Sequence, residues 1–139
     1  MAHEKLLQEL DERRAKAAAM GGEEKLSKRH NRGQLDAWQR VEVLVDEGSF
    51  IEIGLLGASS IVKADEQRTP RDGKIVGFAK IDGRDIGLCV NDFTVKGAST
   101  SATNSKKMAH ARRVATEKGF PFVHVGESTG ARLPDAMGS

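Results

Sequence analysis

The turn of small and polar residues from Gly126 to Arg132 is the part of the chain whose residue types most clearly suggest chemistry. It follows a short apolar run, 120–125, that has the character of a buried strand, and we expect a helix to open at Gly130. A small-residue turn between strand and helix exposes backbone N–H groups at the positive end of a helix dipole. Such a turn can hold a phosphate, or an oxyanion as it forms on a substrate.

A second loop, Asp92 to Ser99, also leaves an apolar run and leads towards a helix. If the two strands are neighbours in one parallel sheet, both loops emerge at the edge where ligands bind. Backbone N–H groups could then converge on one oxygen and stabilise an enolate or a tetrahedral anion. The small residues that permit this are Gly97, Ala98, Gly130 and Ala131. Spacing alone favours a simpler alternative, in which the glycines only make tight turns and close helix–sheet contacts.

Other catalytic arrangements have less support. Ser128 resembles a nucleophile on a turn, but a hydrolase needs a histidine and an acid beside it. The candidate histidines are His110 and His124, and we expect His124 to be a half-buried structural residue of its strand. No Cys or His group has metal-ligand spacing, so we predict no metal site, and no phosphate-loop signature is present.

Positive charge is concentrated between Lys96 and Lys118, a segment with six basic residues and one acidic residue, Glu117. A phosphate-bearing ligand and a solvated helix face explain this segment equally well. The chain as a whole carries a formal charge of only +2. Aromatic residues are scarce, so we predict no nucleic-acid binding.

Composition indicates one ordinary globular domain, with 139 residues of which 38% are hydrophobic. The single cysteine, Cys89, lies in an apolar run and fits a buried thiol in a reducing compartment. No apolar segment approaches transmembrane length, and the first residues do not resemble a secretory signal. We therefore predict a cytoplasmic protein that does not enter membranes.

The elements that must position these loops follow from hydrophobic periodicity and turn residues. We expect helices over 3–20 and 23–30 and a third, capped by Asp36, that runs to Val45. A strand over 50–53 and a polar surface loop over 58–73 follow. Asp82-Gly83 predicts a β-hairpin between 74–81 and 84–91. Thr103 or Asn104 should cap a helix that ends near Lys118. The final strand–helix–strand order favours an α/β sheet.

Several blocks, in this order, resemble the carboxyltransferase (β) subunit of biotin-dependent acyl-CoA carboxylases, the family of the propionyl-CoA carboxylase β chain and methylmalonyl-CoA decarboxylase. The blocks are His30-Asn31-Arg32-Gly33-Gln34-Leu35, Leu44-Val45-Asp46-Glu47-Gly48-Ser49-Phe50, Asp72-Gly73-Lys74-Ile75-Val76-Gly77-Phe78 with Ile81-Asp82-Gly83-Arg84, Asp92-Phe93-Thr94-Val95 with Gly97, and Ser128 with Gly130-Ala131-Arg132.

The resemblance implies an α/β, crotonase-like (ClpP/crotonase) fold of ββα units, incomplete here, with N-terminal helices over 1–48 before a partial carboxyltransferase domain over 49–139. It implies carboxyl transfer between carboxybiotin and the α-carbon of an acyl-CoA thioester. The substrates would be coenzyme A thioesters and biotin on a carrier protein. The partners would be a biotin carboxyl carrier or biotin carboxylase subunit and further copies of the parent chain. By position, Gly130 and Ala131 would supply oxyanion amides, Gly97 and Ala98 the facing loop, and Lys96, Ser128 and Arg132 substrate contacts.

The sequence departs from the family pattern at four positions near this site. Lys96 replaces a Phe, Ala98 and Thr129 each replace a Gly, and Glu127 replaces an Asp. A β-branched residue resists positive φ, so we expect Thr129 to strain the turn and to crowd a ligand.

The resemblance covers roughly the first quarter of the family pattern, and a complete two-domain enzyme needs far more chain. We therefore expect a fragment that does not transfer carboxyl groups alone. The alternative is a free-standing CoA-binding or subunit-interaction module without catalysis.

Overall fold

The computed structural model describes residues 2–61 and 63–137 of the chain. Its helices and strands are, in order, α1 (Ala2–Ala18), α2 (Glu23–His30), α3 (Ala37–Leu44), β1 (Ile51–Ile53), β2 (Lys74–Ile81), β3 (Arg84–Asn91), α4 (Ala102–Lys118), β4 (Phe122–Val125) and α5 (Leu133–Met137). Three short 3-10 segments lie between them, η1 (Lys63–Arg68), η2 (Pro70–Gly73) and η3 (Lys96–Ala98).

The strands form one sheet in the order β1-β2-β3-β4. β1, β2 and β3 are antiparallel neighbours, whereas β4 pairs parallel to β3 after the crossover through α4. The predicted hairpin is confirmed, since Asp82 (φ 49°) and Gly83 (φ 75°) both adopt the positive φ that a type I′ turn requires. The carboxylate of Asp46 accepts hydrogen bonds from both of their backbone N–H groups, at 2.9 and 2.8 Å.

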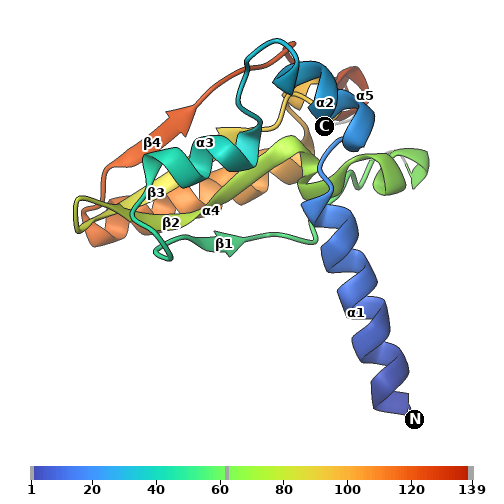
Figure 1. Cartoon of the computed structure of the whole chain (residues 1–139), viewed down its shortest axis with the longest axis horizontal. Helices are drawn as coiled ribbons and strands as arrows, with labels where there is room; N and C mark the ends of the chain where they lie inside the picture. The colour runs from blue at the N-terminus through green and yellow to red at the C-terminus, as the bar shows by residue number, and fades with distance from the viewer. Residues whose placement is uncertain (1, 62, 138–139) are drawn as a thin grey trace.

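Helices cover both faces of the sheet, with α3 on one side and α4 on the other (Figure 1). Because side chains alternate along a strand, β2 and β3 feed two separate apolar clusters. The cluster under α3 contains Ile75, Leu88 and Val90, and the cluster under α4 contains Val76 and Cys89. The prediction of a buried thiol at Cys89 is confirmed.

The third helix begins as predicted, but the fourth does not. Asp36 caps α3 in a reciprocal capping box with Gln39. For α4 the cap is Ser101, so the prediction of Thr103 or Asn104 is wrong. Asn104 is instead the third helical residue, whose side chain bonds back to the N–H of Ser101 at 3.1 Å. Ser101 prevails because its backbone is extended and its hydroxyl accepts from the N–H of Asn104.

The segment 58–73 is only partly the surface loop that its polarity predicted. Thr69, Arg71, Asp72 and Gly73 are buried, and η2 contacts α1, α4 and η3. Arg71 explains the burial: it forms an ion pair with Glu52 at 2.7 Å and donates to the carbonyl of Ala17 at 2.8 Å. Long-range partners, which local polarity does not reveal, therefore bring this segment inside.

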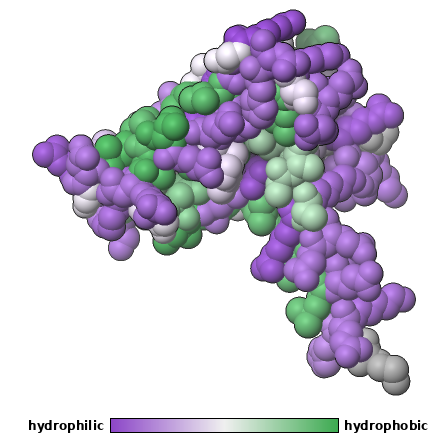
Figure 2. All heavy atoms as spheres, viewed as in Figure 1, coloured by the Kyte–Doolittle hydropathy of each residue, from purple (hydrophilic) through white to green (hydrophobic). Residues whose placement is uncertain are grey.

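α1 projects away from the sheet and its layers (Figure 1). Its C-terminal end is anchored by Ala17, which is buried, while Leu6 and Leu7 are 62% and 61% exposed. Figure 2 shows mostly hydrophilic residues over this helix and apolar residues gathered around α3 and the neighbouring strands. Among the described residues, no helix has the length and apolarity needed to cross a membrane.

Candidate functional site

The two small-residue loops lie side by side, as the parallel-sheet hypothesis predicted. β3 and β4 pair in parallel, with Val90 opposite Val125, so the loops that follow the two strands leave the sheet at the same edge. Backbone hydrogen bonds then continue between the loops. They run from Thr129 N to Gly97 O (3.0 Å), Thr100 N to Gly130 O (2.8 Å) and Arg132 N to Thr100 O (2.8 Å).

The amides proposed for the oxyanion site differ in their availability. The N–H of Ala98 donates to Val95 O at 2.9 Å, and the N–H of Gly130 donates to Ser128 Oγ at 3.1 Å. Ala131 forms a parallel bridge with Thr100 through its neighbours, so its own N–H points away from that strand. Among the described residues no hydrogen bond uses the Ala131 N–H, which leaves it available to a ligand.

The expected helix at Gly130 begins later. α5 starts at Leu133 and has only five residues, so Gly130 and Ala131 precede it and lie outside any helix. The amide of Ala131 therefore owes its availability to the pairing of the two loops and not to a helix N-terminus. The sequence could not predict this, because the bridge to Thr100 depends on a contact between distant segments.

Thr129 does not strain the turn in the way that its type predicted. Positive φ falls on Gly130 (116°), and Thr129 is not among the positive-φ residues of the described chain. Its side chain packs against Gly97, where a Cβ atom would come within 2.5 Å of the Thr129 methyl group. Gly97 therefore gives Thr129 the space it needs.

The facing loop contains a run of three left-handed residues, Lys96 (φ 49°), Gly97 (φ 59°) and Ala98 (φ 51°). L-residues pay about 1–2 kcal/mol for this conformation. Ala98, at the end of the run, and Val95, just before it, are fully buried and hold the run in place. The Lys96 side chain reaches outward and pairs with Asp65 at 2.9 Å.

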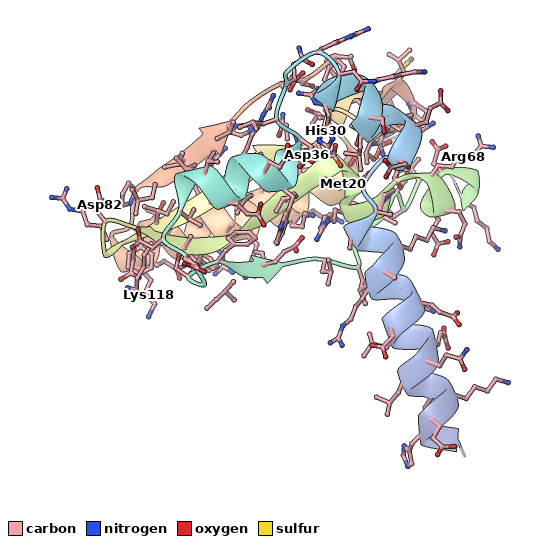
Figure 3. All side chains as sticks on the ribbon, viewed as in Figure 1. Met20, His30, Asp36, Arg68, Asp82 and Lys118 are labelled. Atoms are coloured by element: carbon pink, nitrogen blue, oxygen red, sulfur yellow. The ribbon has the colours of Figure 1, made fainter. Side chains whose placement is uncertain are left out.

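Glu127 ties the turn to the N-terminal helices. Its carboxylate accepts two hydrogen bonds from Arg29, at 3.0 and 2.9 Å, and lies 2.9 Å from Arg40. Hydrogen bonding from Arg29 is the main cause that lowers the pKa of Glu127. A pair of arginines on one carboxylate keeps it ionised and fixes its position. Helices α2 and α3 are also joined by His30 and Asp36, whose side chains meet at 2.9 Å (Figure 3).

Asn91, the last residue of β3, holds the turn from the sheet. Its Nδ2 donates to the carbonyl of Glu127 at 3.1 Å. Its Oδ1 accepts from Lys74 Nζ at 3.0 Å and lies 3.1 Å from His124 Nε2. Burial is the first cause that lowers the pKa values of both Lys74 and His124. The prediction that His124 is half-buried is wrong, because the residue is exposed, although its ring contacts Asn91 within the fold.

Arg132 is held inside the protein. Its side chain is 7% exposed, and Nη1 bonds the fully buried carboxylate of Asp72 at 2.8 Å. The same carboxylate accepts from the hydroxyl of Ser101 and from the N–H of Asn104. Asp72 thus joins η2, the start of α4 and the end of the turn.

Ser128 has no catalytic partner among the described residues. Its hydroxyl donates to the carbonyls of Ala98 and Gly130, at 3.2 and 3.3 Å. His124 bonds Asn91 instead, and His110 lies beside Arg113. The hydrolase arrangement is therefore not formed. Over residues 2–61 and 63–137, no three His, Cys, Asp or Glu side chains come together as metal ligands.

Several side chains of the basic stretch from Lys96 to Lys118 have partners within the protein. Lys107 is buried and donates to the carbonyls of Arg71 and Lys74, at 2.7 and 2.6 Å, and burial lowers its pKa to about 8. Arg112 lies over the ring of Phe122. The stretch therefore does not form one cationic face, because helical periodicity turns Lys107 inward.

The residues that the sequence did not single out are those that hold the loops: Arg29, Asp72, Lys74 and Asn91. Asp72 and Lys74 belong to one block of the family resemblance, but no pattern indicated their partners, and Asp72 was assigned to a surface loop. Each acts through partners more than 15 residues away in the chain.

Comparison with known proteins agrees with this geometry. The model of the carboxyl transferase domain matches residues 28–138. The chain is 35% identical to the propionyl-CoA carboxylase beta chain of Roseobacter denitrificans, covering 96% of this chain and 27% of that protein. It is 33% identical to the methylmalonyl-CoA decarboxylase subunit alpha of Veillonella parvula, covering 92% and 26%.

Solved structures of carboxyltransferases have the same fold. The transcarboxylase 12S hexamer with methylmalonyl-coenzyme A bound superposes with a TM-score of 0.87 at 32% identity, covering 96% of this chain and 27% of that one. A single-chain, multi-domain long-chain acyl-CoA carboxylase gives 0.83 at 28% identity, covering 94% and 14%. The chain spans about a quarter of the length of the curated relatives named here, which is 27% for the first.

The expected fold is thereby confirmed as crotonase-like α/β, with the four-stranded sheet as part of a domain. The division of the chain at residue 48 stays a prediction. The ordered blocks of the sequence, the paired loops and the matched domain lead to one assignment: the chain belongs to the carboxyl transferase domain family.

Proposed function

We propose that this chain provides the acyl-CoA-binding part of a biotin-dependent acyl-CoA carboxyltransferase. The observation that carries the proposal is the pair of hydrogen-bonded loops at the sheet edge, in which no described hydrogen bond uses the N–H of Ala131. The relatives named above act on propionyl-CoA and methylmalonyl-CoA, so an acyl thioester is the class of substrate that we assign.

The chemistry follows from where the charge develops. When the α-carbon of a thioester loses a proton, negative charge builds on the carbonyl oxygen. An N–H that already points to that oxygen, as we propose for Ala131, stabilises the enolate without reorganisation. The α-carbon then bonds to the carboxyl carbon as the bond between that carbon and a biotin nitrogen breaks, and the nitrogen takes up a proton.

The remaining site residues receive supporting parts in this proposal. Gly97 and Ala98 form the wall opposite Ala131, and Gly130 supplies the turn that aims it. Lys96 and Ser128 reach solvent and stay proposed substrate contacts. Arg132 is enclosed with Asp72, so we assign it the positioning of the turn in place of a substrate contact.

The proposal includes partners. Biotin would arrive on a carboxyl carrier protein or biotin carboxylase subunit, and the parent protein would assemble from several copies, as the transcarboxylase 12S hexamer does. The single, buried, unpaired Cys89 suits a reducing compartment, and we propose the cytoplasm.

The test measures polarisation of the thioester carbonyl in the bound state. Propionyl-CoA labelled with ¹³C at the carbonyl is added to the chain, and the carbonyl stretch is followed by difference infrared spectroscopy. We expect a shift to lower wavenumber, because the Ala131 N–H withdraws electron density from the C=O bond. Ala131→Pro removes the N–H and should abolish the shift, while Ala131→Gly keeps it. An unshifted carbonyl in the bound wild-type chain contradicts the proposal.

A further inference from the structure

A cavity of about 440 Å³ lies between α3 and the loop that leads from it into β1. Its apolar walls are formed by Trp38, Val41, Val45 and Phe50. Trp38, Val41 and Val45 follow helical spacing, so they lie on one side of α3 and its C-terminal cap. Figure 2 shows that apolar residues gather over this part of the molecule. The cavity therefore offers an apolar surface at a place that the proposed acyl site does not use.

Trp38 is held in one orientation by its neighbours. Its Nε1 donates to Glu42 at 3.0 Å, and the ring of Phe50 meets it edge-on, with 5.9 Å between the ring centroids. The guanidinium of Arg71 lies over the ring, 5.3 Å from its centroid, and is itself fixed by the ion pair with Glu52. Trp38 is nevertheless only half-buried. A tryptophan that is ordered before binding loses little conformational freedom, which suits it to anchor an interface.

The loop that forms the opposite wall is attached to β2. The N–H of Asp46 donates to the carbonyl of Lys80 at 2.8 Å, and the hydroxyl of Ser49 accepts from the N–H of Lys80 at 3.0 Å. Gly48, with a φ of 70°, makes the turn between Asp46 and Ser49. Contacts within the protein therefore fix both walls, so the cavity is a built feature of the fold.

The charged residues that line the cavity are all acidic: Glu42, Asp46 and Glu47. Among the described residues, no cation forms an ion pair with any of the three. Asp46 accepts hydrogen bonds from the backbone of the hairpin at Asp82 and Gly83, which keeps its carboxylate in place. The potential of the cavity is therefore negative in a chain whose formal charge is +2, so the partner that complements it is cationic.

The apolar walls and the acidic rim together define the partner. A metal ion would neutralise the carboxylates but leave the apolar walls open to water. A purely apolar segment would cover Trp38 but leave the negative charge unmatched. A peptide that carries an apolar side chain between lysine or arginine residues meets both demands, with an apolar centre and a charged rim.

We propose that this cavity docks a basic segment of a partner protein, with an apolar side chain packed on Trp38 and basic side chains facing Glu42, Asp46 and Glu47. The cavity shares no lining residue with the loops around Ala131, so this docking surface and the proposed acyl site can be tested separately.

The experiment uses Trp38 as the reporter, because the chain contains one tryptophan and no tyrosine. The peptides titrated into the chain are acetyl-KKALLKKA-amide, acetyl-KKAAAKKA-amide, which lacks the apolar centre, and acetyl-EEALLEEA-amide, which reverses the charge. Hexylammonium serves as a small organic cation. We expect acetyl-KKALLKKA-amide to shift the emission of Trp38 to shorter wavelength, because it covers the indole ring. It should bind at least about fivefold more tightly than each of the other probes, and added salt should weaken its binding.

Matched variants separate binding at the cavity from general charge. The double variant Glu42→Gln with Glu47→Gln should weaken acetyl-KKALLKKA-amide binding about 3- to 20-fold, the range of two partly exposed charge pairs. Glutamine at position 42 still offers an acceptor to Trp38 Nε1, so the ring keeps its orientation. The control is Glu12→Gln with Glu117→Gln, which removes two exposed glutamates from α1 and α4. This control should change the affinity by less than about twofold, since both residues lie outside the cavity.

The outcomes are distinguishable. Failure of acetyl-KKALLKKA-amide to bind, equal affinity for the acidic peptide, or equal losses in the site variant and the control overturn the docking surface. Hexylammonium binding as tight as that of the peptide overturns its assignment to a protein segment. Binding that leaves the emission of Trp38 unchanged overturns its location. None of these results alters the carbonyl shift expected at Ala131, and an unshifted carbonyl contradicts the acyl site without touching the docking surface.

Discussion

Gly97 and Thr129 form one of the contacts between the two loops of the site. Gly97 is left-handed at φ 59°, and a Cβ there would come within 2.5 Å of the Thr129 side chain. Two separate costs, backbone conformation and steric overlap, therefore oppose any larger residue. They can be measured separately because Gly83 carries the first cost without the second: it has φ 75° and no neighbour within 4 Å of its ideal Cβ.

We expect Gly97→Ala to lower the free energy of unfolding by about 2–4 kcal/mol, and Gly83→Ala by only about 1–2 kcal/mol. In a Thr129→Ala background the cost of Gly97→Ala should fall towards that of Gly83→Ala, because the two closest atoms, the Thr129 methyl and hydroxyl groups, are gone. Urea unfolding followed by circular dichroism gives all of these values. If the costs of Gly97→Ala and Thr129→Ala simply add, the contact does not carry the energy assigned to it.

At the scale of elements, α4 depends on Ser101 for both its start and its place in the fold. The Ser101 hydroxyl accepts from the N–H of Asn104 and donates to the buried carboxylate of Asp72. Thr103, one of the two residues predicted as the cap, uses its side chain within the described part of the chain only to bond the exposed hydroxyl of Ser60, at 3.1 Å.

Ser101→Ala should therefore destabilise the protein by about 1–2 kcal/mol, because it removes a cap and one partner of a buried carboxylate. Thr103→Ala serves as the matched control and should change the free energy of unfolding by less than about 0.5 kcal/mol. Thermal and urea unfolding measure both. A larger loss for Thr103→Ala than for Ser101→Ala would show that the helix begins elsewhere.

The same elements show how far sequence reasoning reaches. The hairpin at Asp82-Gly83 and the cap at Asp36 were predictable, because their signals lie within four residues of each other. The burial of Asp72 was not predictable, because its partners lie about 30 residues away in the chain. The capping box of α4 is local, from Ser101 to Asn104, but neighbouring residues of similar type are also suitable caps, so residue type alone did not select Ser101.

For the candidate site, the residue types and the parallel pairing of the two strands predicted that the small-residue loops would meet. They did not predict which amides remain available. Ala98 and Gly130 satisfy their N–H groups within their own loops, and only the three-dimensional arrangement separates them from Ala131. The family resemblance suggested the reaction, whereas the structure indicated which backbone N–H group is available as a hydrogen-bond donor.

At the scale of the whole molecule, the 139 residues correspond to about a quarter of the relatives' length. We expect these residues alone to bind acyl-CoA without transferring carboxyl groups, because the proposed site holds the thioester from one side only. Purified chain is incubated with propionyl-CoA and a carboxylated biotin carrier, and methylmalonyl-CoA is quantified by mass spectrometry. Its level should equal that of a sample without the chain. Product above this background would show that the residues given are a sufficient catalyst.

Because α1 projects from the sheet and its layers, its first turns are separated from the rest of the molecule. Its first turns leave the globular body, while the anchoring contact lies at the other end, where Arg71 bonds the carbonyl of Ala17 (Figure 1). A fluorophore or affinity tag could thus be attached before Leu10 without altering the proposed acyl site at Ala131. Amide hydrogens in those turns should exchange with solvent far sooner than those of β3, which gives the chain a built-in internal reference for measuring how tightly its core is closed.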